Sequence, residues 1–374
     1  MEHLKVSLLL HFFQPYWQLQ HIFKKIVDEC YRPIFRFLRE NQIKFGFTAN
    51  INYSLLELLE KYGEQDVLRD ISDALRDGQI ELMGGAAYHP IIPLLPENEI
   101  KKQIAQDFRG KKSLRISRNS NGFFFPEMAF SKDALAIVKR YGYSWTVVED
   151  VAVPEYQIPK NRILQCDDFI VFLRSSHWSR YIWDWHLDFS SFTDKLRYEL
   201  PNWTGGSDSY LVIAMDAETF GHHVPGLTEN FLFPMMARWG GKKVVRFEEL
   251  LKSFPLQQIN SSELKDCSWS TSCDDLYHGD SYPLWKSVGN IHHQTLWDLI
   301  NLALIHADSP AAIHPCLKIV NSCHFWWISG RPFWNPGFMM PAADKALEII
   351  NTLGTSEEKF QAKQHHEKLF SLVH

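Results

Sequence analysis

The chain has 374 residues, of which 45% are hydrophobic and 22% are charged, a composition typical of a globular protein with a large core. Its net charge of −5 argues against nucleic acid or an anionic membrane surface as a partner. No apolar run approaches the roughly 18 residues of a membrane span, and the N-terminal run is interrupted at His11, too early for a signal peptide. Six cysteines without CxxC pairing indicate reduced thiols, and we expect a cytoplasmic protein.

Short apolar runs alternate with segments of helical periodicity through the first 255 residues. The predicted strands are residues 6–10, 45–48, 80–83, 123–125, 144–148, 169–173 and 211–215. This alternation predicts an α/β fold, a seven-stranded parallel (β/α) barrel over residues 1–255. Beyond residue 255 the strand-like runs fade, and we expect a helical region over 256–374 that packs on the barrel.

Two carboxyl groups follow the last predicted strand. Asp216 and Glu218 come directly after the buried run 211–215, and His222 and His223 follow them. The C-terminal ends of parallel strands are where α/β proteins build their sites, so this stretch favours chemistry. The alternative is the start of a helix, with Asp216 as its N-cap and Glu218 in its first turn.

A further carboxyl group, Glu127, stands directly after another strand and Pro126, which marks the end of the strand. Glycoside hydrolysis uses two carboxyl groups, one as nucleophile or base and the other as general acid, and Glu127 and Asp216 at two strand ends could supply them. The alternative is a pair of loop carboxylates that never meet.

Further polar residues gather at the strand ends. His11 with Gln14, and Glu81 with His89, add groups suited to binding substrate hydroxyls. The histidines near the strand ends, together with Asp216, also suggest a metal site, but their spacing fits no tight metal motif. We therefore expect no metal and no cofactor.

These stretches resemble the motifs of glycoside hydrolase family 57. The first motif, usually HxHQPY, is similar to HFFQPY at 11–16, and the second resembles residues 78–90. The third and fourth resemble FPE at 125–127 and DAETFGH at 216–222, and the fifth resembles residues 269–271 and 322–327. Two positions depart from the pattern: Phe13 replaces the second histidine of the first motif, and Cys323 stands where many relatives carry Asp.

The resemblance implies a retaining mechanism on α-glucans or malto-oligosaccharides, without a metal. Glu127 would be the nucleophile, and Asp216 would be the acid/base, which must stay protonated near neutral pH. The residues expected to bind substrate are His11, Gln14, Glu81, Glu218, His222, Trp269 and Trp327.

Several alternatives remain open at the level of sequence. The motifs do not separate α-amylase, 4-α-glucanotransferase and branching enzyme, which all occur in this family. A metal-dependent polysaccharide deacetylase or mannosidase-like enzyme on a related barrel is a second hypothesis, and it predicts bound zinc. A non-catalytic sugar-binding protein is a third. The expected partner is an oligosaccharide or polysaccharide substrate, with no nucleic acid and no membrane, and nothing in the sequence indicates an oligomeric state.

Overall fold

The structure is a computed structural model that describes the whole chain except residues 1–3, 156–157, 159–160, 184–186, 205–206 and 374. The chain divides into two compact units. Unit 1 comprises residues 1–85, 107–124 and 138–265, and unit 2 comprises residues 86–106, 125–137 and 266–374. The expected single boundary near residue 255 differs from this division, because two segments from between the strands cluster with the C-terminal helices.

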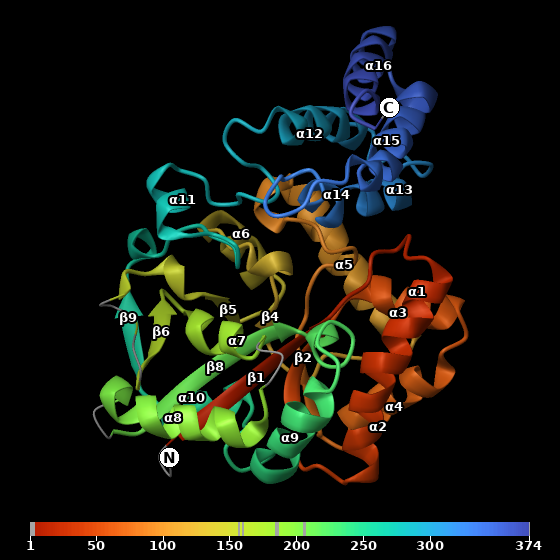
Figure 1. The fold of residues 1–374 in the computed structure, drawn as a ribbon. Helices are drawn as coiled ribbons and strands as arrows, with labels where there is room; N and C mark the ends of the chain where they lie inside the picture. The colour runs from red at the N-terminus through yellow and green to blue at the C-terminus, as the bar shows by residue number, and fades with distance from the viewer. Residues whose placement is uncertain (1–3, 156–157, 159–160, 184–186, 205–206, 374) are drawn as a thin grey trace. The chain divides into compact units, whose positions relative to one another are not determined.

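All described strands lie in unit 1, and four of them form the first sheet (Figure 1). Its order is β3 (Ile80–Leu82), β2 (Phe47–Ile51), β1 (Leu4–Phe12) and β8 (Ser209–Asp216), and all pairs are parallel. The strands are almost continuously buried, as expected for apolar runs covered on both faces. The register pairs His11 with Asp216, so the polar ends of β1 and β8 lie beside each other.

The second sheet has five strands in the order β4 (Gly122–Phe123), β5 (Trp145–Glu149), β7 (Phe169–Arg174), β6 (Ile163–Cys166) and β9 (Leu256–Ile259). Strand β6 runs antiparallel to β7, and the other pairs are parallel. The seven predicted strands are present, but β6 and β9 were not predicted. Both are only four residues long, and β9 is polar and largely exposed, so neither carries a strong strand pattern.

The expected barrel is corrected in one respect: the described ladders form two sheets of four and five strands, not one closed sheet of seven. The ladders stop between β3 and β4, where a single parallel bridge joins Gly84 to Phe123. They also stop between β7 and β8, where the Ser175 N–H donates to the Val212 carbonyl at 2.8 Å. Strand β4 is only two residues long, which leaves no room for a longer ladder with β3.

Helices of unit 1 cover the strands with apolar faces, and Figure 1 labels them. Their bounds are α1 (Gln20–Ile26), α2 (Arg32–Glu40), α3 (Tyr53–Lys61), α4 (Gln65–Arg76), α7 (Ser176–Tyr181), α8 (Phe189–Thr204), α9 (Phe233–Trp239) and α10 (Phe247–Ser253). Between α1 and α2 lies a π-helical turn, η1 (Val27–Tyr31). Pro33 follows it, and because its ring crowds the carbonyl four residues earlier, the helix widens at this point.

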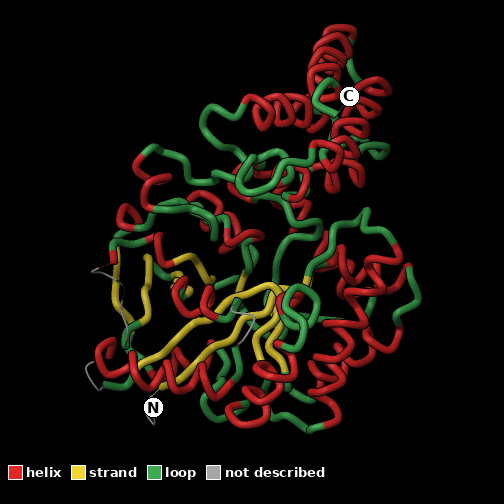
Figure 2. The backbone as a smooth tube through the Cα atoms, viewed as in Figure 1, coloured by secondary structure: helices red, strands yellow, loops and turns green. Residues whose placement is uncertain are grey.

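The regular elements described in unit 2 are helices, joined by loops, which confirms the expected helical C-terminal region (Figure 2). Its helices are α11 (Cys273–Tyr277), α12 (Ile291–Leu304), α13 (Ile313–Ile319), α14 (Cys323–Trp326), α15 (Met340–Leu353) and α16 (Ser356–Phe370). Helices α12, α15 and α16 pack against one another. Helices α5 (Glu97–Ser113) and α6 (Lys132–Lys139) each contribute residues to both units.

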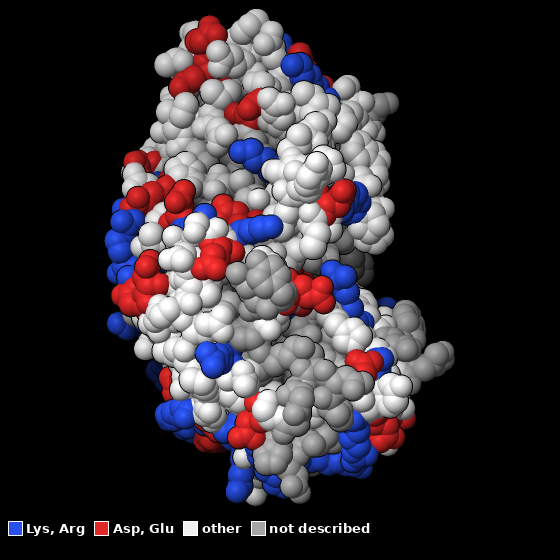
Figure 3. Space-filling view, turned by 90° about the vertical axis from the view of Figure 1, so that its left-hand side faces the viewer, with Lys and Arg blue, Asp and Glu red and all other residues white. Residues whose placement is uncertain are grey.

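Short 3₁₀ turns follow several strands, and two of them carry the predicted carboxyl groups. These two are η3 (Pro126–Met128) and η6 (Ala217–Thr219). On the face drawn in Figure 3, acidic and basic side chains are interspersed. Among the described residues, no helix combines the length and the apolar character that a membrane crossing requires.

Candidate active site

Asp216 is the last residue of β8 and immediately precedes the η6 turn. Asp216 occupies the N-cap position of that turn and Glu218 lies in its first turn, as the alternative predicted, but the turn is 3₁₀ and the Asp216 side chain makes no capping hydrogen bond. The surrounding protein raises the pKa of the Asp216 carboxyl, while the charge of Arg174 opposes the rise. The side chain itself is open to solvent, which limits the effect of burial.

Glu218 lies two residues further on and is buried, with 6% of its surface exposed. Its Oε1 accepts a hydrogen bond from the Tyr31 hydroxyl and another from Gln14 Nε2 at 2.9 Å. Burial raises the pKa of Glu218, and the charge of Asp216 raises it further, while Tyr31 and Gln14 act in the opposite direction. The two carboxyl groups repel each other when both are charged, so the pair retains a proton more readily than two separate carboxyls.

Arg174, the last residue of β7, is the charged neighbour of Asp216 from the second sheet. Its Nη1 donates to Glu149 Oε2 at 2.7 Å, and its Nε donates to the Ala214 carbonyl at 2.9 Å. The guanidinium is thus held by a carboxylate from β5 and by the backbone of β8. It supplies a fixed positive charge whose opposite sign favours the ionised form of nearby carboxyl groups.

His11 is buried at the end of β1, and burial lowers its pKa to about 3, so the ring is neutral near pH 7. Asn50 fixes its tautomer. The Asn50 amide donates from Nδ2 to the Gly84 carbonyl at 3.2 Å, which turns its Oδ1 toward His11 Nδ1 at 2.9 Å. His11 Nδ1 therefore carries the hydrogen, and Nε2 has the lone pair of an acceptor. The His11 ring stacks on the ring of Phe124, with centroids 4.7 Å apart, and its centroid lies 5.9 Å from that of Phe13, a position where the sequence departs from the motif.

The loop after Glu218 is fixed against the π-helical turn η1. His222 Nδ1 lies 2.7 Å from Glu29 Oε2, and Cys30 Sγ donates to the Ala217 carbonyl at 2.9 Å. Gly221 has a φ of +102°, and a Cβ at this position would lie 2.2 Å from the Glu29 carbonyl oxygen. Only glycine fits both the backbone conformation and the close approach.

Glu127 lies in unit 2, within the η3 turn, and its backbone has φ 59° and ψ 17°, a left-handed conformation that is uncommon for glutamate. Three side chains hold its carboxyl. Ser322 Oγ donates to Oε1 at 2.8 Å, and Trp269 Nε1 donates to Oε2 at 2.7 Å. His89 Nδ1 lies 2.9 Å from Ser322 Oγ and 3.5 Å from Glu127 Oε1. Donors on both oxygens favour the ionised form that a nucleophile needs.

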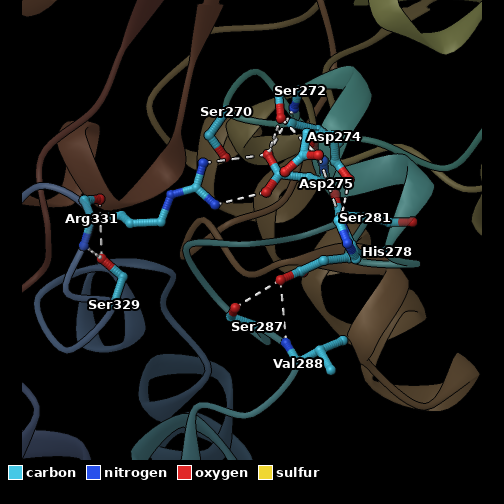
Figure 4. Close-up of polar contacts among 12 residues, drawn as sticks. Ser270, Ser272, Asp274, Asp275, His278, Ser281, Ser287, Val288, Ser329 and Arg331 are labelled. Carbon is cyan, nitrogen blue, oxygen red and sulfur yellow. Dashed lines mark hydrogen bonds and ion pairs between the residues drawn. The ribbon is translucent and has the colours of Figure 1, made fainter.

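An ion pair between Arg331 and Asp275 lies in the same unit as Glu127 (Figure 4). Arg331 donates to Asp275 through Nη1 at 2.7 Å and Nη2 at 3.3 Å. Asp275 also receives the Ser272 N–H at 2.9 Å, and the Arg331 guanidinium is the main cause that lowers its pKa to about 2. Asp275 follows Trp269 closely in the chain and Arg331 follows Ser322, so the pair links the two segments that reach Glu127.

Trp269 and Trp327 are both in unit 2 and differ in their surroundings. Trp269 is 37% exposed and contacts Glu127 directly through its indole nitrogen. Trp327 stacks on Phe338 with ring centroids 4.8 Å apart and lies 4.8 Å from Trp326. Trp269 is therefore placed beside a predicted catalytic carboxyl, whereas Trp327 belongs to an aromatic group in the same unit, and its role in binding substrate stays a prediction.

Glu81 is set apart from the other predicted residues of unit 1. It is 1% exposed, and its Oε2 accepts from the Thr48 hydroxyl at 2.7 Å and from the Phe247 N–H at 3.3 Å, at the start of α10. Burial raises its pKa to about 7. These are the contacts of a buried carboxyl in the core, and a role in binding sugar hydroxyls stays a prediction.

The structure gathers His11, Gln14, Asp216, Glu218 and His222 in one part of unit 1. In unit 2 it brings Trp269 to Glu127. Sequence reasoning did not assign a role to Tyr31 and Ser322, which donate to these carboxyls, to Arg174, whose charge acts on Asp216, or to Asn50, which orients His11. It predicted that His89 binds substrate hydroxyls, and the structure places this residue beside Ser322 and Glu127. Within the described part of the chain, no three His, Cys, Asp or Glu side chains are grouped so that they could hold a metal ion.

These features define an α/β protein of the glycoside hydrolase class, with carboxyl groups that follow parallel strands and polar side chains that hold them. More narrowly, the chain belongs to glycosyl hydrolase family 57, whose family model matches residues 5–258. The family resemblance found in the sequence motifs is thereby confirmed.

Individual relatives are distant. Alpha-amylase 1 from Dictyoglomus thermophilum is 23% identical over 146 residues, which are 38% of this chain and 21% of that protein. The solved 4-alpha-glucanotransferase from Thermococcus litoralis is similar with a TM-score of 0.72 at 16% identity, over 94% of this chain and 60% of that one. A family 57 branching enzyme from Thermococcus kodakaraensis gives a TM-score of 0.71 at 13% identity, over 100% and 96% of the two chains. The match spans about a fifth of the length of the curated relatives, and the structural likenesses describe the fold.

Proposed function

We propose that the protein is a retaining glycoside hydrolase or transglycosylase that acts on α-glucans or malto-oligosaccharides, with Glu127 as nucleophile and Asp216 as acid/base. The observation that carries the proposal is the environment of Glu127. A carboxylate with a donor on each oxygen, on a left-handed backbone, is held ionised and in one orientation. Family membership and the names of the distant relatives, which are alpha-amylases and a 4-alpha-glucanotransferase, support the substrate class.

The reaction proceeds in two displacements. Glu127 attacks the anomeric carbon while Asp216 gives its proton to the departing glycosidic oxygen, which leaves a covalent glycosyl ester. Asp216, now ionised, then takes a proton from water or from an acceptor hydroxyl, which attacks the same carbon and releases Glu127. Such a double displacement needs the two carboxyl groups about 5–5.5 Å apart.

The neighbours of each carboxyl support these roles. Neutral donors surround Glu127 and keep it ionised. Burial raises the pKa of Asp216 to about 6, against the opposing charge of Arg174, which brings the carboxyl toward the range that an acid near neutral pH requires. His11, with its acceptor nitrogen, His222 and Trp269 are proposed to bind sugar hydroxyls and ring faces. Phe13 beside His11 supplies an apolar wall at the same place.

Two broader features are proposed with this function. The bridge at Gly84 and the hydrogen bond at Ser175 support interpreting the two sheets as one strongly distorted seven-stranded (β/α) barrel, with β6 and β9 added at the side. The spacing of the six cysteines, which form no CxxC motif, supports a reducing, cytoplasmic location.

Glu127→Ala and wild type, assayed on malto-oligosaccharides, amylose and glycogen with products separated by size, test the proposal. We expect wild type to release or rearrange α-1,4-linked products, and the variant to lose at least about 10⁴-fold in kcat. Glucose or short oligomers indicate hydrolysis, whereas longer or branched products indicate transfer. Glu348→Ala, an exposed carboxyl on α15, is the matched control in the same unit. A wild type inert on every α-glucan, or an unimpaired Glu127→Ala, contradicts the proposal.

Azide supplies a second test of the nucleophile. An external anion can replace the missing carboxylate of Glu127→Ala, attack the anomeric carbon and restore turnover. We expect a glycosyl azide of the opposite anomeric configuration to the substrate. The absence of rescue with an activated substrate, in a variant that still binds malto-oligosaccharide, would argue against Glu127 as the nucleophile.

A further inference from the structure

A directed series of hydrogen bonds leads from the backbone to Glu218. The Leu19 N–H donates to Gln18 Oε1 at 3.0 Å, so the other end of that amide, Nε2, donates to Gln14 Oε1 at 2.9 Å. Gln14 Nε2 in turn faces Glu218 Oε1 at 2.9 Å. Because a backbone N–H can only donate, it fixes the orientation of both amides, and Gln14 presents an –NH₂ group to Glu218.

Tyr31 adds a second donor to the same oxygen. Gln14 Nε2 also lies 3.2 Å from the Tyr31 oxygen and donates to it, which directs the Tyr31 hydrogen away from Gln14. Burial raises the pKa of Tyr31 well above its usual range, so the hydroxyl keeps its hydrogen. That hydrogen has two acceptors, Glu218 Oε1 and the Phe13 carbonyl at 3.1 Å, and a carboxylate is the stronger of the two.

These donors discriminate between the two protonation states of Glu218. An ionised Glu218 carboxylate accepts both hydrogen bonds at full strength, whereas a neutral Glu218 carboxyl accepts them more weakly. The hydrogen of a neutral carboxyl also needs an acceptor, and the Gln14 –NH₂ group is not one. No side-chain donor to the Asp216 carboxyl is found among the residues that the structure describes. Burial and the charge of Asp216 act on Glu218 in the opposite direction, so these two donors are what would leave the retained proton of the pair on Asp216.

Other titratable and charged groups surround the pair from every adjoining element. The elements that adjoin the pair carry His11 on β1, Asp28, Glu29 and Cys30 on η1, Arg174 on β7 with its partner Glu149 on β5, and His222 and His223 in the following loop. Arg174 faces Asp216 and favours its ionised form, against the bias described above. Glu29 pairs with His222, and Cys30 donates to the Ala217 carbonyl, so neither contributes a donor to Glu218.

We propose that Gln14 and Tyr31 are positioning residues that hold Glu218 as an ionised acceptor and so leave on Asp216 the proton needed for the acid step. Asp216 passes that proton to the leaving oxygen, and both carboxyls are then charged. Their repulsion favours recovery of one proton from water or an acceptor hydroxyl in the second displacement, so protons balance over the cycle. The proposal rests on the proposed function for the role of Asp216, and it changes the expected role of Gln14 from substrate contact to support of Glu218.

Tyr31→Phe removes only the hydroxyl, and two substrates separate its effects. A malto-oligosaccharide has a poor leaving group that needs the acid, whereas α-maltosyl fluoride loses fluoride with little protonation. We expect kcat/KM to fall about 10- to 100-fold on the oligosaccharide and to change little on the fluoride. The matched control is Tyr210→Phe on β8, whose buried hydroxyl donates to the Arg162 carbonyl at 2.8 Å. An equal loss on both substrates overturns the proposal.

A double-mutant cycle tests whether Tyr31 acts through Glu218. In the Glu218→Gln background the proton can no longer be shared, so adding Tyr31→Phe is expected to change the oligosaccharide rate less than twofold. Full additivity of the two losses overturns the proposal. If Tyr31→Phe fails to fold by circular dichroism, Gln14→Met, which keeps the side-chain length and removes the donor, is expected to show the same selective loss.

A titration followed by ¹³C NMR reads the proton directly and does not depend on activity. The carboxyl carbons are assigned with Asp216→Asn and Glu218→Gln. In wild type we expect the shift of a protonated carboxyl at Asp216 and of a carboxylate at Glu218 near neutral pH, and the reverse in Tyr31→Phe. A wild-type protein that keeps the proton on Glu218 overturns the inference. A protein inert on both substrates that shows the expected shifts refutes only the proposed function.

Discussion

The two predicted catalytic carboxyls stand in opposite kinds of surroundings. Glu127, in unit 2, receives donors on both oxygens from Ser322 and Trp269. Asp216, in unit 1, has a second carboxyl as its neighbour, and the donors in that region go to Glu218 instead. The same functional group is thus held ionised in one place and discouraged from ionising in the other. When two environments shift the pKa values of two carboxyl groups in opposite directions, the group with the lower pKa suits the nucleophile and the other suits the acid.

The backbones differ as well. Glu127 has a left-handed conformation that costs on the order of 1–3 kcal/mol and that the surrounding hydrogen bonds maintain. Asp216 ends a regular strand with φ −68° and ψ 134°. A nucleophile must approach one carbon in one direction, and a fixed carboxylate serves that purpose. An acid/base must release one proton and recover one in each cycle, and it depends more on its charged neighbours than on backbone strain.

Asp216→Ala is the strongest test of the comparison. We expect kcat/KM on malto-oligosaccharides to fall about 10²- to 10⁴-fold, because the leaving oxygen departs without a proton. The descending limb of the pH profile, which reports the loss of the acid proton, is expected to disappear. Asp216→Asn is the isosteric control and should behave in the same way. A descending limb that persists in both variants would show that another group supplies the proton.

Gly221→Ala tests how far the acid region depends on its contact with the π-helical turn. A Cβ would lie 2.2 Å from the Glu29 carbonyl at a φ of +102°, so we expect a loss of about 3 kcal/mol in unfolding free energy. Gly279→Ala is the matched control, since its φ is +74° but nothing lies within 4 Å of the added carbon. It should lose only about 1 kcal/mol. Urea denaturation measures both, and equal losses would mean that the contact with Glu29 contributes nothing.

Ser322→Ala probes the nucleophile region in turn. Loss of one donor makes ionised Glu127 less stable, so kcat/KM is expected to fall about 10-fold and its ascending pH limb to move to higher pH. Trp269→Phe removes the donor on the other oxygen and should act in the same direction. Ser329→Ala, a nearby hydroxyl that contacts Arg331, is the control. An ascending limb that does not move in either variant would show that these donors do not maintain the charge of Glu127.

Much of the fold was predictable because it rests on local patterns. The seven apolar runs correspond to the strands β1 to β5, β7 and β8, and the carboxyls were found because they follow such runs directly. Strand β6 was missed because it forms by antiparallel pairing with β7, and such a pairing leaves no mark in a four-residue segment. Periodicity also does not reveal that residues 86–106 and 125–137 cluster with the C-terminal helices.

The candidate site was predictable only in its reactive groups. Glu127, Asp216 and Trp269 belong to motifs, but Tyr31 lies in a helix whose apolar spacing predicts a core residue. Its hydroxyl reaches Glu218 across a sequence separation of 187 residues, and the π-helical turn determines where it points. Glu81 illustrates the opposite case, since its motif predicts a sugar contact and the fold buries it between Thr48 and α10.

The pKa of Glu81 can be compared with those of Asp216 and Glu218, because Glu81 is a buried carboxyl whose hydrogen-bond partners are a hydroxyl and a backbone N–H. Burial raises its pKa from 4.5 to about 7, so its neutral form is favoured in the folded protein. That contribution to stability is complete below pH 4.5 and is lost as the pH rises through 7. We expect the stability of Glu81→Gln, which stays neutral, to rise relative to wild type by on the order of 3 kcal/mol between pH 4.5 and 8. Urea denaturation across this range measures the difference, with Glu348→Gln, an exposed carboxyl on α15, as control. A difference that does not change with pH would show that burial alone does not keep a proton on a carboxyl in this fold.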